Sequence, residues 1–290
     1  MKRTVSYTVE SRYDGRQVKQ FLKDEAGISS RLVKLLKRTP DGLLLNGAHV
    51  RTVDVLRKGD TLTLNIPESS RPVEPSDVHV PVLYEDGDVI VFDKPPFMPV
   101  HPTRNHQGDT LANAFSGYLA SKGMQAAFRA VNRLDRDTSG AVVTALNQMA
   151  ASKLQASLNK TYVAIVYGEW SGSGTIDLPI YRPSPLLIRR AVGEAGERAV
   201  THWSCAEVKN GMSMLKIKLE TGRTHQIRVH FSHLGCPLVG DTMYGDGDSR
   251  IARQALHCAE VEFVHPVTNL KTTVKSPLPG DIRLLFYGNL

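Results

Sequence analysis

Cysteine is scarce in this sequence, with three residues in 290: Cys205, Cys236 and Cys258. So sparse and odd-numbered a set excludes a disulfide framework and is typical of a reducing compartment. Long apolar runs are also missing, because stretches such as Ala141–Leu146 fall far short of the roughly 18 residues that a membrane span requires. The first ten residues, MKRTVSYTVE, lack an apolar signal core. We therefore expect a cytoplasmic protein that does not engage a membrane.

Acidic residues are too few to balance the basic ones, with 29 Asp and Glu against 36 Lys and Arg, a net charge of +7. The excess is uneven: residues 1–70 hold 13 basic and 8 acidic residues, whereas residues 71–290 hold 23 and 21. A basic first quarter attached to a nearly neutral body indicates a module that binds a polyanion. On charge alone, a basic surface that is merely solvated remains the alternative.

A proline-rich segment divides the chain. The stretch PESSRPVEPSDVHVP, between Pro67 and Pro81, carries four prolines and little hydrophobic periodicity. Such a composition is typical of a semi-rigid linker. We therefore predict a first domain over residues 1–67, a linker over 68–81 and a second domain over 82–290.

The first domain contains a predicted basic helix. Ser29 and Ser30 are good N-caps for the segment RLVKLLKR. On a helical wheel its leucines fall on one side, and Arg31, Lys34 and Arg38 fall on the other. We expect the leucines to anchor the helix and the three cations to face solvent or bind phosphate.

Two apolar strand segments follow this helix, LLLNGAHV and DVLRKGDTLTLNI, with turns at Asn46-Gly47 and Gly59-Asp60. Together with the helix they form a small mixed α/β pattern over residues 12–66. In its order of helix, Asn-Gly strand and Lys-Gly-Asp turn, this stretch resembles the S4 RNA-binding domain of a ribosomal protein and several RNA-modifying enzymes. The resemblance implies that residues 1–67 bind RNA.

The second domain mixes strands and helices without a regular βαβ rhythm. Strands are predicted in VLYEDGDVIVFDKPP (broken by a turn), AVVTALN, TYVAIVYG and SMLKIKLE, and Asn147 is placed to cap a helix through MAASKLQASL. This pattern favours an α+β fold with a large mixed sheet and flanking helices over a doubly wound sheet.

One loop, VNRLDRDTSG over residues 131–140, places carboxylates among turn-forming residues. A structural Asx-turn would explain Asp135 or Asp137 in most proteins. The run Asp-Thr-Ser-Gly also occurs in aspartic proteases, but their dyad needs a second such loop. Only Gly245–Ser249 comes near, and it does not match.

The same loop carries a more specific resemblance. Asn132 to Gly140 is similar to the signature of the RluA-type pseudouridine synthases, commonly His-Arg-Leu-Asp-x-x-Thr-Ser-Gly. Six further blocks similar to the family occur in the family's order, across roughly residues 82–270: LYEDGDVIVFDKPPFMPVHP, GDTLANAF, KTYVAIVYG, TGRTHQIRVHF, LVGDTMYG and LHCAEVEFVHP. The resemblance implies the pseudouridine synthase fold, mainly antiparallel, and an isomerase that converts uridine in RNA to pseudouridine.

Site residues follow from this resemblance. It implies that Asp135 is catalytic and that Arg223 pairs with it as an adjacent cation. It also implies that Tyr162 stacks on the target base and that Arg133 occupies the space left by the flipped nucleotide. For Tyr162 an ordinary core position remains open, and for Arg223 an ordinary surface position. Asn132 replaces the usual histidine, which affects a local hydrogen bond.

The chemistry needs no cofactor, because the uridine N1–C1′ bond breaks and uracil rejoins the ribose through C5 without redox change or added water. A single carboxylate suffices, whereas glycoside hydrolysis requires two. Histidines and a cysteine gather at His225, His230, His233 and Cys236, but their spacing matches no common zinc framework. The apolar residues Ile227, Phe231 and Leu234 instead predict an amphipathic helix that ends at Gly235. We expect no metal.

Two functions from different classes remain after this reasoning. The first is an RNA pseudouridine synthase that acts as a monomer on ribosomal RNA, with tRNA as the other possible substrate. The second is a non-catalytic RNA-binding or ribosome-assembly factor built on the same fold. The presence of Asp135, Tyr162 and Arg223 together favours the enzyme.

Overall fold

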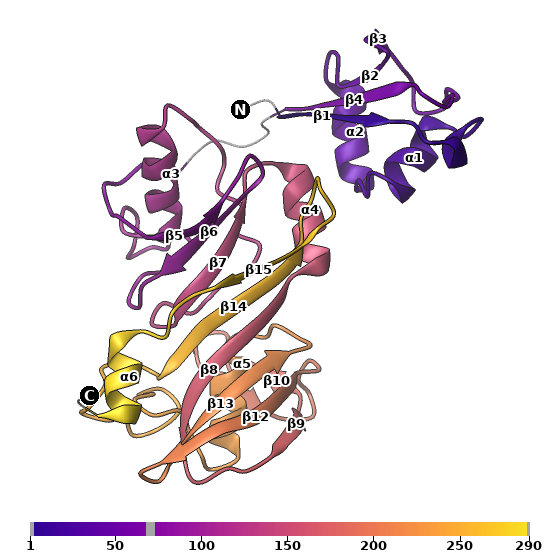
Figure 1. Ribbon diagram of the computed structural model, residues 1–290. Helices are drawn as coiled ribbons and strands as arrows, with labels where there is room; N and C mark the ends of the chain where they lie inside the picture. Colours follow the sequence, from indigo (N-terminus) through magenta and orange to yellow (C-terminus); the bar gives the residue numbers. More distant parts are fainter. Residues whose placement is uncertain (1–2, 68–72, 289–290) are drawn as a thin grey trace.

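The computed structural model describes residues 3–67 and 73–288. The first of these stretches forms a four-stranded sheet in the order β1-β4-β2-β3, with two helices packed beside it (Figure 1). Its elements are β1 (Arg3–Thr8), the short 3-10 helix η1 (Ser11–Tyr13), α1 (Val18–Asp24), α2 (Ser30–Arg38), β2 (Leu43–Leu45), β3 (Ala48–His49) and β4 (Thr61–Ile66).

Helix α2 is the predicted basic helix. The Ser29 hydroxyl accepts a hydrogen bond from the Leu32 backbone N–H at 3.3 Å, which satisfies one of the free donors of the first turn. Leu32 and Leu36 are fully buried in the core of this sheet. The opposite side exposes three cations, none of which forms an ion pair with another described residue: Arg31, Lys34 and Arg38.

The predicted linker is only partly within the described residues, because residues 68–72 lie outside them. From Glu74 onward the chain lies against helix α3 (Leu111–Ser121). The Ser76 N–H donates to the Asn113 carbonyl at 3.2 Å, and the Asn113 side-chain amide donates to the Glu74 carbonyl at 2.8 Å. This part of the segment is therefore fixed to the second domain.

The rest of the chain is built on a nine-stranded sheet in the order β5-β6-β7-β14-β8-β13-β12-β9, with β15 paired to β14. Among these described strands only β7 and β14 run parallel, so the predicted mixed and mainly antiparallel sheet is confirmed. Its strands are β5 (Val82–Glu85), β6 (Val89–Lys94), β7 (Ser139–Ala145), β8 (Asn159–Tyr167), β9 (Ser173–Asp177), β12 (Val200–Lys209), β13 (Met212–Leu219), β14 (Leu256–Val264) and β15 (Lys271–Lys275).

Further helices pack around this sheet (Figure 1). They are α4 (Gln148–Ser157) against β7 and β14, α5 (Gln226–His233) against β12, and α6 (Gly280–Tyr287) near the C-terminus, and a small hairpin is made by β10 (Ile180–Tyr181) and β11 (Ala191–Val192). Asn147 caps α4 as predicted, because its side chain accepts from the Ala150 N–H at 2.9 Å. Within the described part of the chain, no helix has the length and apolarity to cross a membrane.

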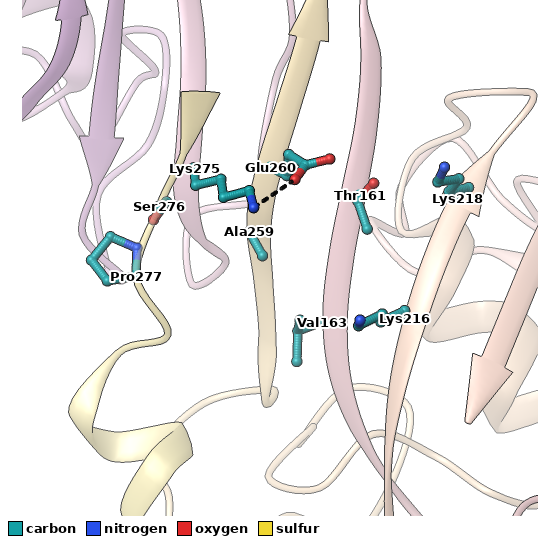
Figure 2. A pocket seen from close by; sticks show the side chains of 9 residues that line it. All are labelled: Thr161, Val163, Lys216, Lys218, Ala259, Glu260, Lys275, Ser276 and Pro277. Atoms are coloured by element: carbon teal, nitrogen blue, oxygen red, sulfur yellow. Dashed lines mark ion pairs between the residues drawn. The ribbon is translucent and has the colours of Figure 1, made fainter. Parts of the chain in front are cut away.

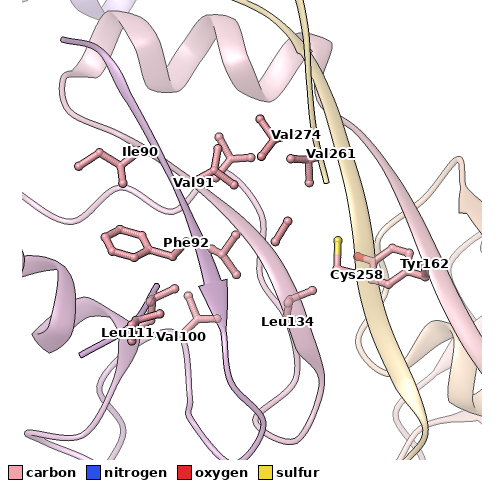
Figure 3. Close-up of a cluster of buried hydrophobic side chains, with 14 of the residues drawn as sticks. Ile90, Val91, Phe92, Val100, Leu111, Leu134, Tyr162, Cys258, Val261 and Val274 are labelled. Atoms are coloured by element: carbon pink, nitrogen blue, oxygen red, sulfur yellow. The ribbon is translucent and has the colours of Figure 1, made fainter. Parts of the chain in front are cut away.

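The largest core cluster lies between the sheet and helix α3 and continues along β8 and β14 (Figure 3). Strands β7 and β14 approach very closely at Gly140, which has a φ of 115°. A Cβ atom placed there would lie 2.3 Å from the Cys258 carbonyl oxygen, so only glycine fits. The loop that precedes β7 is thereby held directly beside β14.

Residues 3–67 are in contact with the rest of the described chain. Arg3 on β1 donates two hydrogen bonds to the buried carboxylate of Asp88, at 2.8 and 2.6 Å. Met149 on α4 is fully buried within the core cluster of the first domain, and the Tyr7 hydroxyl lies 3.8 Å from its sulfur. Asp88 also accepts a hydrogen bond from the side chain of Asn147 at 2.8 Å, so one carboxylate links the first domain to the start of α4.

Candidate active site

Asp135 lies in the loop that leads into β7, and its side chain is 27% exposed. The loop is pinned by Asn132, whose side-chain amide donates to the Ala141 carbonyl at 3.1 Å and accepts from the Val143 N–H at 2.9 Å. A turn hydrogen bond from the Thr138 N–H to the Asp135 carbonyl, at 3.1 Å, follows. Asn132 thus anchors the loop to the sheet through these two hydrogen bonds. It stands where the family signature commonly has histidine, a difference that was expected to affect a local hydrogen bond.

A buried lysine supports this loop through a hydrogen bond to its backbone. The fully buried Lys94, at the end of β6, donates from Nζ to the carbonyls of Pro95, Met98 and Arg136 at 2.7, 2.8 and 3.0 Å. Burial lowers the pKa of Lys94 to about 7, against the opposing charges of Asp137 and Asp135. Lys94 was not predicted from the sequence to belong to the site, although a lysine at the end of an apolar strand is a detectable signal.

A buried arginine supports the other side of the loop. Arg253 donates from Nη1 to the Asp137 carbonyl at 3.3 Å and pairs through Nε with Asp281 of α6 at 2.7 Å. Two buried basic side chains therefore bind successive carbonyls of the loop, those of Arg136 and Asp137. The backbone that directly follows Asp135 is fixed by groups that do not depend on a substrate.

The cation beside Asp135 is Arg228 on helix α5. Its Nη1 lies 3.2 Å from Asp135 Oδ2, while Nε and Nη2 bind the two carboxylate oxygens of Asp241 at 2.7 and 2.9 Å. Burial opposes the charge of Arg228, but hydrogen bonds with Asp241 and the charges of both aspartates outweigh it and raise the pKa. Arg228 is therefore a fixed positive charge that orients the Asp135 carboxylate.

Arg223, the arginine that the resemblance implied as the partner of Asp135, is engaged elsewhere. It forms an ion pair with Glu197, and its Nε donates to the Arg198 carbonyl at 3.2 Å. The structure does not show the expected ion pair of Arg223 with Asp135, because Arg228 is the arginine that pairs with this carboxylate. The physical reason is that α5 begins at Gln226, so Arg228 lies on the helix that faces Asp135, whereas Arg223 lies in the preceding turn.

His225 faces Asp135 from the start of α5. Its Nε2 lies 3.9 Å from Asp135 Oδ2, and its Nδ1 is hydrogen-bonded to the Tyr244 hydroxyl at 2.9 Å. Burial lowers the pKa of His225, although the charge of Asp135 raises it in part. The Tyr244 ring also stacks against the guanidinium of Arg228, whose carbon lies 5.0 Å from the ring centroid. Neither His225 nor Tyr244 was identified from the sequence as part of the site.

Tyr162 and Arg133 differ in their exposure. Tyr162, on β8, is 6% exposed and belongs to the main core cluster beside Cys258 (Figure 3). Burial raises the pKa of Tyr162 well above its ordinary value, with smaller contributions from Cys258 and Asp135, so its hydroxyl lies within electrostatic reach of the carboxylate. Arg133 is exposed, and together with burial its charge lowers the pKa of His101 nearby.

Arg228 binds two aspartates, and only Asp135 of the two is accessible. Asp241 is the other aspartate bound by Arg228, but its side chain has no exposed surface. Its oxygens are already used by Arg228 and by the N–H groups of Met243 and Tyr244, at 3.0 and 3.1 Å. Arg228 therefore holds one accessible carboxylate, that of Asp135.

The buried histidine of α5, His230, is satisfied within the protein. His230 is hydrogen-bonded to the Thr201 hydroxyl and to the Leu178 carbonyl, both at 2.9 Å. The helix buries Ile227 and Phe231 as predicted, but Leu234 is exposed because α5 ends before it.

One group of described residues has the geometry of a metal site, Asp86, Asp88 and His265. It lies away from Asp135, at the contact between the domains. Its oxygens already accept hydrogen bonds from Arg3, from the Tyr84 hydroxyl at 2.5 Å and from His265 at 2.8 Å. Hydrogen bonds within the protein therefore already occupy oxygens of both carboxylates.

A groove of about 620 Å³ lies on the opposite face of the sheet (Figure 2). Thr161 and Val163 of β8 line it, and because strand residues alternate, Tyr162 between them points to the Asp135 side. Three lysines, Lys216, Lys218 and Lys275, border it. The groove is therefore separate from the site around Asp135.

Known proteins with similar sequences point to one family. Residues 88–233 match the family described as RNA pseudouridylate synthase. The chain is 39% identical over 272 residues to "Uncharacterized RNA pseudouridine synthase YjbO" of Bacillus subtilis, covering 91% of this chain and 96% of that protein. It is 38% identical over 274 residues to "Ribosomal large subunit pseudouridine synthase D" of Pseudomonas aeruginosa, covering 87% and 84%.

A solved structure agrees with these relatives. "Human RNA Pseudouridylate Synthase Domain Containing 1" superposes with a TM-score of 0.57 at 26% identity, covering 71% of this chain and 86% of that one. The matched family segment contains the Asp135 loop, Tyr162 and the whole of helix α5 with Arg228. The chain therefore belongs to the RNA pseudouridine synthases, isomerases that convert uridine in RNA to pseudouridine.

Proposed function

We propose that this chain isomerises uridines of ribosomal RNA and that Asp135 is the catalytic group. The observation that carries the assignment is the pair formed by Asp135 and Arg228: the carboxylate is partly exposed at the surface of its loop, and the arginine that orients it is itself locked by the buried Asp241. A fixed carboxylate is suited to act at the ribose without reorganisation during the reaction.

In this reaction the N1–C1′ bond breaks, C1′ joins C5 of the same uracil, and the proton on C5 leaves to water. Asp135 serves either as a nucleophile at C1′ or as a base that removes a ribose proton. Tyr162 stacks on the target base, and Arg133 fills the space that the extruded nucleotide leaves. His225, which burial favours in the neutral form, adds no positive charge that would compete with Arg228 for the carboxylate.

Residues 1–67 act as an S4-like RNA-binding domain in this proposal, and Arg31, Lys34 and Arg38 bind phosphates. The exposure of these three cations without acidic partners among the described residues supports this role. Ribosomal RNA is the proposed substrate because the relative from Pseudomonas aeruginosa is named for the ribosomal large subunit. The protein acts in the cytoplasm as a monomer, without metal.

The test is tritium release from RNA that contains 5-tritiated uridine, with EDTA present throughout. Large-subunit ribosomal RNA and total tRNA are compared as substrates. Asp135→Asn should reduce release at least a hundredfold, the usual contribution of a positioned acid–base group, while RNA binding is retained. Asp137→Asn is the matched control, because it makes the same chemical change two residues away on a side chain that pairs with Arg136, and it should remain active.

Near wild-type turnover of Asp135→Asn would refute the assignment of the catalytic group. RNA binding without tritium release by the wild-type protein would instead favour the non-catalytic ribosome-assembly factor. Activity that disappears in EDTA and returns with zinc would require a metal. Mapping pseudouridines by chemical-adduct primer extension, in cells with and without the gene, would identify the modified uridine.

A further inference from the structure

Phe97 has an unusual backbone conformation for an aromatic residue. It lies just after β6 with a φ of 64°, in the left-handed region that glycine or asparagine usually occupies. Its side chain is nevertheless 51% exposed. Phe97 therefore bears backbone strain without burying its ring, a combination that folding alone does not favour.

The turn around Phe97 is held from both sides. The buried amine of Lys94 donates to the carbonyls of Pro95 and Met98, at 2.7 and 2.8 Å. Met98 is buried, and the Pro99 carbonyl accepts from the Leu111 N–H at 2.9 Å. These contacts fix the backbone on both sides of Phe97 and hold its ring toward solvent.

This turn is attached directly to the catalytic loop. The same Lys94 nitrogen donates to the Arg136 carbonyl at 3.0 Å, one residue beyond Asp135. Further along, His101 lies close enough to Arg133 for that cation to affect its charge. The turn with Phe97 and the loop with Arg133 and Asp135 thus form neighbouring parts of one surface.

We propose that Phe97 is a stacking platform for a nucleobase beside the target uridine, a role that rests on the proposed function. Extrusion of the target separates it from its neighbours and leaves a base with one unstacked face. An exposed aromatic ring on a fixed backbone is a group that proteins use to stack such a base, whatever its identity. The ring therefore adds affinity for RNA without specifying sequence.

Two substitutions separate stacking from folding. Phe97→Asn removes the ring but keeps a residue that tolerates a positive φ. Phe97→Trp keeps an aromatic face. Leu270→Asn is the control, because it removes an exposed apolar side chain, 67% exposed, from the turn between β14 and β15.

Binding is measured with large-subunit ribosomal RNA in an Asp135→Asn background, and kcat/KM for tritium release is measured in the active protein. Phe97→Asn should weaken binding roughly tenfold or more and lower kcat/KM similarly, with an unchanged or higher melting temperature. Phe97→Trp should stay within about threefold of the unsubstituted protein, since it retains a stacking face. Leu270→Asn should leave binding unchanged.

Unchanged RNA affinity in Phe97→Asn would overturn the proposal. A loss that Phe97→Trp shares, or that accompanies a lower melting temperature, would overturn it as well, because it would show a structural role. If Phe97→Asn left RNA binding intact but abolished a concentration-dependent dimer, the ring would belong to a contact between copies and the proposal would fail. A wild-type protein that releases no tritium would refute the proposed function, while the binding measurements would still decide the role of Phe97.

Discussion

Arg228 connects a buried aspartate to an exposed one. It donates to both oxygens of Asp241 and still reaches Asp135 with Nη1. Arg223, five residues earlier in the same sequence block, has a partly exposed side chain that pairs with Glu197. An exposed pair of that kind contributes about 0–1 kcal/mol, whereas breaking a buried pair costs about 3–5 kcal/mol.

Substitution of the two arginines should therefore have unequal effects. Arg228→Lys cannot keep both the bidentate contact with Asp241 and the contact with Asp135, so we expect turnover to fall at least tenfold with a lower melting temperature. Arg223→Lys should leave both nearly unchanged. Single-turnover tritium release and thermal unfolding measure the two quantities. A large loss of turnover in Arg223→Lys, without one in Arg228→Lys, would show that Arg223 is the partner of Asp135, as the sequence resemblance implied.

The residues of the site differ in how visible they are in the sequence. Asp135 could be proposed as a candidate because its loop has a specific pattern, and Tyr162 because it lies in a strand block of the same family. The choice between Arg223 and Arg228 could not, since both occur in TGRTHQIR and only the start of α5 at Gln226 decides which one faces the carboxylate. Lys94 supports the loop across a separation of 42 residues, a tertiary contact that local patterns do not encode.

At the scale of elements, the Asp135 loop is positioned by the junction of β7 with β14. These strands are the parallel pair of the large sheet, and they meet at Ser139 with His257 and at Gly140 with Cys258. The sequence predicted β7 as a strand, because its residues are apolar. It could not predict the partner, which lies more than a hundred residues away in the chain.

Gly140→Ala tests this junction. The added Cβ would meet the Cys258 backbone at 2.3 Å and would occupy a φ of 115°, so we expect a loss of about 3 kcal/mol or more in the free energy of unfolding. Gly211→Ala, at a φ of 71° with open space around it, is the matched control. It should cost only about 1–2 kcal/mol, the price of the backbone conformation. Urea unfolding of the two variants measures the difference. Equal losses in the free energy of unfolding would show that the close approach of Gly140 to β14 does not add to the cost of the substitution.

At the scale of the whole molecule, basic side chains occur on two separate surfaces that allow a charge-matched comparison. The test variant changes three residues of α2 to glutamine: Arg31, Lys34 and Arg38. The control changes three lysines of the groove to glutamine: Lys216, Lys218 and Lys275. Both variants remove three positive charges, so a difference between them reports position and not net charge.

The α2 variant should bind RNA more weakly and with a flatter salt dependence. Three phosphate contacts at about −0.7 each contribute a slope of about −2, which is roughly a 20-fold loss of affinity between about 50 and 200 mM salt. The variant should not show this roughly 20-fold loss of RNA affinity as the salt is raised. Its turnover at saturating RNA should change little, because Asp135 and Arg228 are distant from α2 in the sequence. Filter binding across this salt range measures both slopes. Equal slopes in the two variants would show that α2 does not bind phosphates.

The burial of Met149 in the first domain has a consequence for how such a protein can be recombined. Residues 3–67 close their own core around a side chain that α4 supplies, and Arg3 neutralises Asp88 of the second domain. In a chimera that exchanges the first domain for that of a relative, the new domain must therefore have space in its core for the Met149 side chain. It must also have an arginine at the position of Arg3. Without them, Asp88 would be buried without a cationic partner. A boundary placed at the prolines would also separate Met149 from the core cluster in which it packs.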